Sequence, residues 1–149
     1  MLLSKEIAVY LNLVACRFKQ YTASLLKRNN IDLTPEQFLT IDILWNLGAM
    51  PQYRIVEAMR KDKNSVTKLV DALEKKQLVE RTQDKADRRS NLVSLTPKAE
   101  AMKNETKQFG MSKLDDILKE IDEKELQSFR ATLKKIDNAM TEGEALRSE

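Results

Sequence analysis

The 149 residues suit a single domain, and a globular domain of this length can bury roughly 70% of its unfolded surface. With 42% hydrophobic residues, 33% charged residues, 3 Gly and 3 Pro, the composition favours long helices over a turn-rich β fold or a disordered chain. The net charge is only +3, and the lack of His and the single Cys exclude an imidazole base, an intrachain disulfide and a cysteine-cluster zinc site.

Two helices are expected at the start of the chain. In residues 1–27, apolar side chains recur every three or four positions, which predicts a long amphipathic helix that needs a partner surface. The stretch NNIDL, 29–33, interrupts this pattern. Residues 34–37, Thr-Pro-Glu-Gln, are typical of a helix start, with a hydroxyl cap, Pro at the first position and Gln able to bond back. This second helix is expected to end at about Leu47, before Gly48.

Two shorter helices with a charged turn between them are expected next. In residues 51–60, apolar side chains share one face and predict a helix of about two and a half turns. Beyond the charged residues 60–63, the apolar spacing from Val66 to Leu73 predicts another helix, with Asp62 able to cap its start. The opposite face of this helix is polar and consists of Asn64, Ser65, Thr67, Lys68, Asp71 and Lys75.

A β-hairpin and two long helices complete the expected elements. Residues 78–83 and 91–96 have partial period-2 character, and the seven residues between them are polar apart from Ala86, which predicts a hairpin with a charged tip. A helix is then expected from residue 97 to about 120, after Thr96-Pro97. A last helix is expected from residue 122 to about 140, with a frayed tail beyond it.

Positive charge is concentrated in the middle of the sequence. Residues 51–99 contain 12 Lys and Arg against 7 Asp and Glu, a net charge of +5. Residues 1–50 carry +1 and residues 100–149 carry −3. The basic part of the chain therefore coincides with the two short helices and the hairpin.

The order of short helix, turn, helix and charged hairpin is that of a winged helix-turn-helix, whose second helix enters the DNA major groove. With long helices on both sides, the sequence resembles the MarR family of bacterial transcription regulators. Asp87-Arg88-Arg89, SNLVS and Leu95-Thr96 match the wing signature of that family without a gap. Residues 65–84 resemble its recognition helix and first wing strand, so the close match covers about a third of the chain.

The resemblance implies a mainly α fold with a small β-hairpin wing. Within a single domain, 1–149, residues 34–96 would form the winged helix-turn-helix lobe, and residues 1–30 and 97–140 would form dimerisation helices. It further implies a homodimer that binds a palindromic operator in double-stranded DNA, as a repressor released by a small ligand or another signal. No cofactor, metal or catalytic activity is expected.

Four positions depart from the family pattern. The family usually has Gly where Gln77 and Ala99 stand, and Arg60 and Lys61 replace a usual Gly and an apolar residue. After a helix, Gly commonly takes a left-handed conformation that costs Gln about 1 kcal/mol, so the turn at Gln77 could differ. Arg60 and Lys61 raise the charge of their turn and leave its packing open.

The expected recognition helix supplies one set of candidate DNA contacts. Ser65, Thr67 and Lys68 face away from the apolar stripe and could reach base edges and phosphates. Asn64 is an additional candidate because its amide can pair with adenine in the major groove. The alternative for this face is an ordinary solvated helix surface.

The expected wing supplies a second set of candidate contacts. On this interpretation Asp87 holds Arg89, and Arg89 enters the minor groove, where narrow A·T tracts concentrate negative potential. Lys85 and Arg88 would touch phosphates, which adds affinity and salt dependence but little sequence information. The alternative is a merely soluble hairpin loop with a surface ion pair.

Further candidates lie around the first short helix. Arg54, Arg60, Lys61 and Lys63 could contact the DNA backbone, and Gln52 and Tyr53 stand at a helix start where exposed N–H groups can bind phosphate.

Residues that could respond to a small ligand or an oxidant are harder to identify from the sequence. Cys16 lies between apolar neighbours and is expected in the core, with a redox role as the alternative. No effector-binding residue is identified, although aromatic residues could line a pocket between the dimer helices and the winged lobe. These aromatic residues are Tyr10, Tyr21, Phe38, Trp45 and Tyr53, and packing in the core is the alternative for them.

Two other functions remain as alternatives. A winged-helix protein-interaction module would fit the modest net charge and the acidic C-terminal third. An enzyme is disfavoured because the acidic pairs 115–116 and 122–123 point different ways on a helix and lack a nearby nucleophile or phosphate cradle. The chain has no signal peptide or run of about 20 apolar residues, so a cytoplasmic protein that does not bind membranes is expected.

Overall fold

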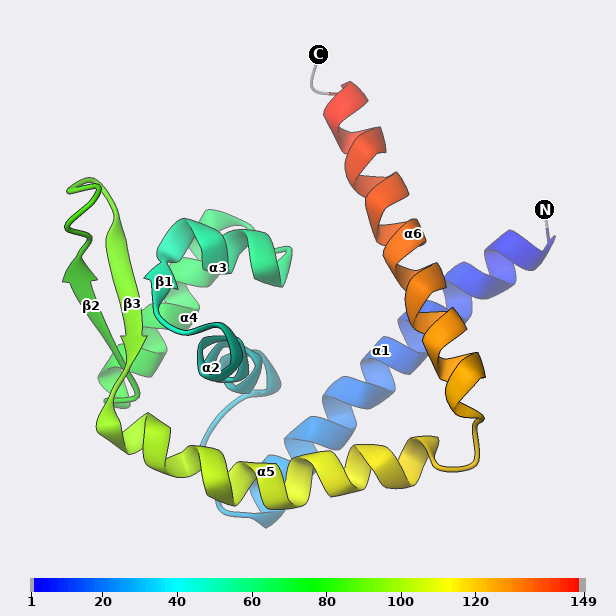
Figure 1. Cartoon of the computed structure of the whole chain (residues 1–149), viewed down its shortest axis with the longest axis horizontal. Coiled ribbons are helices and arrows are strands. Elements are labelled where there is room, and N and C mark those ends of the chain that lie inside the picture. Colours follow the sequence, from blue (N-terminus) through cyan, green and yellow to red (C-terminus); the bar gives the residue numbers. More distant parts are fainter. Residues whose placement is uncertain (1, 148–149) are drawn as a thin grey trace. The chain divides into compact units, whose positions relative to one another are not determined.

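The computed structural model describes residues 2–147, except for the side chains of residues 108–112 and 145–147. The chain divides into two compact units, Met1–Phe109 and Gly110–Glu149. The first unit contains most of the secondary structure and the whole of the predicted winged lobe (Figure 1).

The first helix, α1 (Leu2–Arg28), ends in a turn that an asparagine makes possible. Asn30 has a φ of 56°, in the left-handed region that Asn tolerates better than most residues. The N–H of Ile31 donates to the carbonyl of Leu26 at 2.9 Å, and the N–H of Asn30 donates to that of Lys27 at 3.2 Å. These two bonds form a Schellman motif, which closes the helix and turns the chain toward the next one.

The second helix, α2 (Pro35–Leu47), begins and ends as the sequence predicts. The N–H of Gln37 donates to Thr34 Oγ1, and the N–H of Thr34 donates back to Gln37 Oε1, both at 3.2 Å. At the other end Gly48 has a φ of 82°, and its N–H donates to the carbonyl of Leu44. The capping box and the glycine therefore set both helix boundaries.

The helix-turn-helix consists of α3 (Gln52–Met59) and α4 (Lys63–Lys75). Arg60, in the turn between them, is left-handed with a φ of 54°. Asp62 caps α4, because its carboxylate accepts hydrogen bonds from the Ser65 N–H at 3.0 Å and the Ser65 hydroxyl at 2.5 Å. The cap predicted from the sequence is confirmed.

Gln77 takes the left-handed conformation that a glycine would take, with a φ of 60°. The N–H of Leu78 donates to the carbonyl of Leu73 at 3.0 Å, and the N–H of Gln77 donates to that of Glu74 at 2.9 Å. This is again a Schellman motif. In its backbone conformation, the turn after α4 is therefore not altered by the absence of glycine.

The wing is formed by β2 (Val79–Gln83) and β3 (Asn91–Leu95), which pair antiparallel with Arg81 opposite Val93. A third strand, β1 (Met50–Pro51), pairs with the other edge of β3, so that the sheet order is β1-β3-β2. The sequence analysis predicted the hairpin but not β1. Two residues are too few to show a period-2 pattern, and their pairing depends on a strand 43 positions away, from Met50 to Val93.

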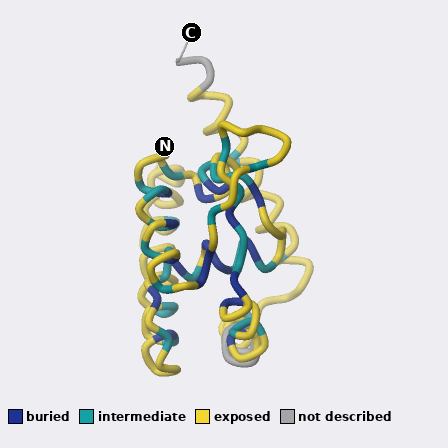
Figure 2. Tube along the Cα trace, turned by 90° about the vertical axis from the view of Figure 1, so that its left-hand side faces the viewer, coloured by how far each residue is buried: buried dark blue, intermediate teal, exposed yellow. Residues whose placement is uncertain are grey.

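The core of the first unit lies between the helices and the sheet. Its buried residues come from α2, α3 and α4, from the strands and from the ends of α1 and α5 (Figure 2). The largest fully buried apolar side chains are those of Leu26, Ile41, Ile55, Val66, Val70, Leu73, Val79 and Val93. These residues include Val66, Val70 and Leu73 of the apolar stripe that predicted α4.

Two long helices follow the wing. The helix α5 (Pro97–Leu118) begins in the first unit, where the N–H of Ala99 donates to Thr96 Oγ1 at 3.3 Å. The helix α6 (Glu123–Arg147) lies in the second unit, and Asp122 Oδ2 accepts from the Lys124 N–H before it. The expectation of a frayed tail beyond residue 140 is wrong up to Arg147, because helical hydrogen bonding continues there. Residues 148–149 lie outside the described part of the chain.

Candidate nucleic-acid interface

The polar side chains at the start of α4 differ in their exposure and in the hydrogen bonds that they make within the protein. Lys63, Asn64 and Lys68 are exposed. Ser65 is half-buried, and its hydroxyl and N–H are both used by Asp62. These hydrogen bonds hold the pKa of Asp62 below its usual value, so the cap is charged at neutral pH. Asn64 and Lys68 are therefore the predicted residues of this helix whose side chains reach solvent most openly.

Thr67 is less accessible than its place on the polar face of α4 suggests. Its hydroxyl donates to the carbonyl of Lys63 at 2.9 Å and accepts from Gln52 Nε2 at 3.0 Å. Gln52 stands at the first position of α3, so this bond joins the two helices of the helix-turn-helix. Both side chains thus serve the packing of α3 on α4, whereas Tyr53, the neighbour of Gln52, is exposed.

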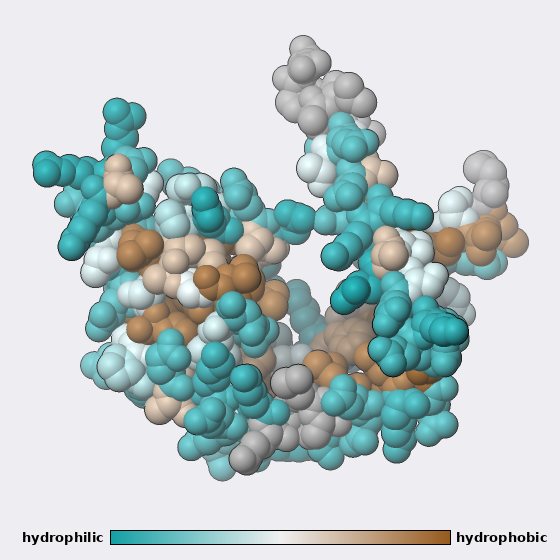
Figure 3. Space-filling model, in the orientation of Figure 1, coloured by the Kyte–Doolittle hydropathy of each residue, from teal (hydrophilic) through white to brown (hydrophobic). Residues whose placement is uncertain are grey.

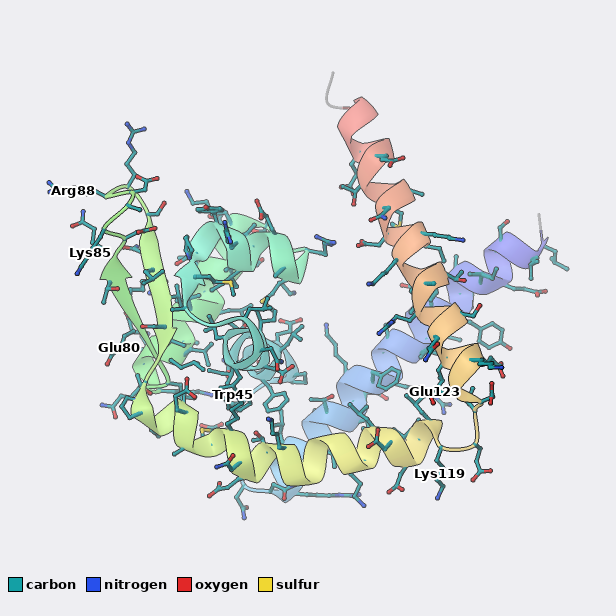
Figure 4. All side chains as sticks on the ribbon, in the orientation of Figure 1. Trp45, Glu80, Lys85, Arg88, Lys119 and Glu123 are labelled. Atoms are coloured by element: carbon teal, nitrogen blue, oxygen red, sulfur yellow. The ribbon has the colours of Figure 1, made fainter. Side chains whose placement is uncertain are left out.

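The wing tip carries three exposed basic side chains. Lys85, Arg88 and Arg89 lie in the turn between β2 and β3, and the labelled Lys85 and Arg88 extend outward from it in Figure 4. The surface of the tip is predominantly hydrophilic in Figure 3. This arrangement places several positive charges at the far end of the hairpin.

Asp87 organises this turn through contacts with its backbone. Its Oδ1 accepts from the backbone N–H of Arg89 at 3.0 Å, and its carbonyl accepts from the N–H of Ser90. Within the described part of the chain, no ion pair between Asp87 and the Arg89 guanidinium is present. Asp87 therefore holds the backbone of Arg89, because a carboxylate two residues earlier in a tight turn reaches the N–H more readily than the end of a long side chain.

The helix α3 and the turn after it contain the other predicted cations. Arg54 and Arg60 are exposed, and Arg60 Nη1 donates to the carbonyl of Glu57. Lys61 instead pairs with Glu36 on α2 at 3.2 Å. Glu36 also pairs with Lys19 on α1 at 2.9 Å, so one carboxylate joins α1, α2 and this turn.

These contacts change the proton affinities of the groups involved. Hydrogen bonds from Lys19 and Lys61 hold the pKa of Glu36 below its usual value, and the hydrogen bond to Glu36 raises the pKa of Lys19. Glu36 and Lys19 are thus charged at neutral pH. Lys61 points its charge toward α2, whereas Arg54 lacks such a carboxylate partner among the described residues.

Arg81 is a central residue of this region that the sequence analysis missed. It lies in the middle of β2, and its guanidinium contacts Asp71 and Glu74 of α4. A basic residue on the inward face of a strand, seven and ten positions after two acids on the preceding helix, is a weak signal in a sequence that is one-third charged. Only the packing of the wing against α4 identifies its partners.

The aromatic candidates for an effector site do not gather in one cavity. Phe38 and Trp45 meet edge to face with ring centroids 6.0 Å apart, and Trp45 Nε1 donates to the carbonyl of Ala99 at 3.1 Å. Both rings pack against the core, whereas Tyr10 is 67% exposed. A cavity of about 380 Å³ between α1 and α2 is lined by Phe38, with Phe18, Lys19 and Glu36 among its other residues.

The expectation that Cys16 is buried is wrong for the single chain. Its thiol is exposed on α1, and its nearest polar contact is Gln20 Nε2 at 3.9 Å. The neighbours Val14 and Phe18 are exposed as well, at 47% and 38%. Figure 3 shows hydrophobic surface at the N-terminal end of α1, where Leu2 and Leu3 are exposed.

No helix in the described part of the chain has an apolar stretch long enough to cross a membrane. Among the residues that the structure describes, no three Cys, Asp or Glu side chains lie close enough together to hold a metal ion.

Comparison with known proteins places this lobe among transcriptional regulators. Residues 33–90 match the sequence model of the MarR family. The chain is 30% identical over 127 residues to the uncharacterized HTH-type transcriptional regulator YsmB of Bacillus subtilis (strain 168), and the match covers 85% of this chain and 86% of that protein.

Solved structures share the fold over almost the whole chain. A MarR/EmrR family transcriptional regulator from Acinetobacter sp. ADP1 aligns with a TM-score of 0.84 at 19% identity, over 93% of this chain and 97% of that one. The structure of an S. aureus MepR-DNA complex aligns with a TM-score of 0.78 at 22% identity, over 89% and 96% of the respective chains.

Proposed function

Because this chain belongs to the MarR family of transcriptional regulators, we propose that it is a homodimeric repressor of a palindromic DNA operator. In each lobe, α4 enters the major groove and the wing tip reaches the adjacent minor groove. The observation that carries this proposal is the group of exposed cations at the wing tip beside an α4 whose first turns expose Asn64 and Lys68. Neither set of side chains is needed for the core of the lobe.

The proposed DNA-binding residues differ in which part of the DNA they contact. Asn64 and Lys68 contact base edges and phosphates in the major groove, and Arg89 enters the minor groove. Lys63, Lys85, Arg88, Arg54 and Arg60 contact phosphates and supply sequence-independent affinity. Ser65, Thr67 and Asp87 act mainly through their hydrogen bonds within the protein, by which they hold the helix start and the wing turn in shape.

Dimerisation is supported by the apolar surface of α1. Leu3, Ile7 and Tyr10 recur at helical spacing along it and are each more than 40% exposed. A continuous stripe of this kind on a long helix is typical of a surface that a partner helix covers. A second copy of the chain gives two lobes related by a twofold axis, which matches a palindromic site. The cavity between α1 and α2 is the candidate site for a small effector molecule that releases the DNA.

The test is selection of bound duplexes from a random-sequence pool by the purified chain. We expect an inverted repeat with half-sites about one helical turn apart. Sedimentation should show a dimer. Absence of any enriched sequence, together with weak binding that salt abolishes, would contradict the proposal and favour a protein-interaction module.

Substitutions then separate base reading from phosphate binding. Arg89→Ala should weaken operator binding by about 1–3 kcal/mol, whereas Lys85→Ala should lower the salt slope by about 1 without changing the preferred sequence. Lys75→Ala is the matched control, because Lys75 is an exposed cation in the last turn of α4, away from the helix start. Operator binding by Arg89→Ala as tight as that of the parent protein would refute the role of Arg89.

A further inference from the structure

Arg81 occupies a position in β2 where an apolar side chain would be expected. Val79, two residues earlier on the same strand face, is fully buried, whereas Glu80 between them is exposed (labelled in Figure 4). The side chain of Arg81 is only 17% exposed. A charged group so far from water is costly unless several partners satisfy it.

Four groups satisfy the guanidinium of Arg81. Its Nη1 lies 2.7 Å from Asp71 Oδ1 and 3.4 Å from Glu74 Oε1. Its Nε donates to Gln52 Oε1 at 3.2 Å, and its Nη2 donates to the carbonyl of Thr67 at 3.4 Å. Each nitrogen of the fork therefore has an acceptor, which is a geometry that a lysine ammonium cannot reproduce.

The partners lie on the two helices of the helix-turn-helix. Thr67, Asp71 and Glu74 follow one another by about one turn along α4, and Gln52 begins α3. The side chain of Gln52 also donates to Thr67, so the contacts form a single network. The guanidinium of Arg81, in the middle of β2, thus binds groups on three successive turns of α4.

We propose that Arg81 is a positioning residue that sets the wing relative to α4, so that the two can contact adjacent grooves at the same time. Arg81 itself does not touch DNA. This inference rests on the proposed function, because it requires that Arg89 at the wing tip contributes to operator binding. Loss of Arg81 loosens the wing from α4 while the core contacts of Val79 and Val93 keep the hairpin folded.

A double-mutant cycle tests this role in the full-length protein on its selected operator. In the parent protein, Arg89→Ala weakens operator binding by a certain factor. In the Arg81→Met background, we expect Arg89→Ala to weaken operator binding by a factor at least five times smaller, since coupled sites show interaction energies of this order. The effect of Lys68→Ala, on α4 itself, should be the same in both backgrounds. Glu80→Gln, on the opposite face of the same strand, is the matched control and should leave the effect of Arg89→Ala unchanged.

The control for folding uses two further variants. Arg81→Lys keeps the charge and should lie between the parent and Arg81→Met. Asp71→Asn removes the negative charge from the shortest contact and leaves Arg81 in place, so it reports on the network even when Arg81→Met fails to fold, as judged by circular dichroism. Reduced coupling to Arg89 in Asp71→Asn would support the inference.

The outcomes also separate this inference from the proposed function. An undiminished effect of Arg89→Ala in Arg81→Met, or in Asp71→Asn where Arg81→Met does not fold, would overturn the positioning role and leave operator binding intact. An equal loss of the Lys68 and Arg89 effects would overturn it as well, because it would indicate a general loss of structure. A parent protein that selects no sequence would overturn the proposed function and this inference together.

Discussion

The turn after α4 offers a direct test of how backbone conformation sets stability in this lobe. Gln77 has a φ of 60°, and its side chain is exposed without a hydrogen bond among the described residues. Replacement by Gly therefore removes no side-chain hydrogen bond. It leaves both bonds of the Schellman motif, from the N–H groups of Gln77 and Leu78, in place.

The magnitude follows from two opposing effects. A left-handed backbone conformation raises the free energy of an ordinary residue by about 1–2 kcal/mol, whereas Gly adopts it without this penalty. Gly in turn raises the conformational entropy of the unfolded chain, which offsets about 0.5–1 kcal/mol. Gln77→Gly should thus stabilise the lobe by about 0.5–1 kcal/mol, or raise Tm by roughly 1–4 °C for a chain of this length.

Urea unfolding at one protein concentration measures this change, since dimerisation makes apparent stability depend on concentration. Gln77→Ala is the control, because Ala also lacks the Gln side chain but keeps the cost of the left-handed conformation. We expect the order Gly above Gln, with Ala close to Gln. A Gly variant no more stable than the Ala variant would refute the explanation from backbone strain.

Two other stability predictions concern helix α2. Because the folded-state pKa of Glu36 is lowered by Lys19 and Lys61, its contribution to stability is present above the unfolded-state pKa and is lost as the pH falls through the folded-state pKa. Glu36→Gln should accordingly lower the urea midpoint slightly at pH 7 and hardly at pH 3; equal shifts at the two pH values would contradict this. Thr34→Ala should cost about 1 kcal/mol by removing one half of the capping box with Gln37, whereas Thr34→Ser should retain stability, as thermal unfolding of both variants would show.

The residues that define helix ends could be identified from the sequence because their interactions are local. Thr34 with Gln37 and Asp62 with Ser65 each bridge three positions, so the capping bonds depend on nearby backbone alone. The wing tip was predicted for a similar reason, since a polar stretch between two alternating segments is typical of a hairpin loop. The cations Lys85, Arg88 and Arg89 are exposed there as expected.

The contacts that individual side chains make in the folded chain were not predicted from the sequence. Lys61, a candidate for phosphate binding, pairs with Glu36, which lies 25 positions away. Cys16 was expected in the core because its neighbours are apolar, but its thiol is exposed. The hydrophobic pattern of a helix does not indicate whether its apolar face packs against the same chain or against another one. Asp87 was expected to hold Arg89, and the structure adds that it does so through the backbone N–H of Arg89.

By itself, the sequence determined the type of the described helices and their approximate ends, except for the C-terminal end of α6. It also determined the wing hairpin and its charge, because these features depend on spacing, caps and turns within a few residues. Only the tertiary structure decided that β1 joins the sheet, that Gln52 and Thr67 are used to pack α3 on α4, and that Arg81 fastens the wing to α4. Arg81 meets Gln52 across 29 positions of the chain. Such contacts exist only when the core brings the segments together, so no local pattern in the sequence records them.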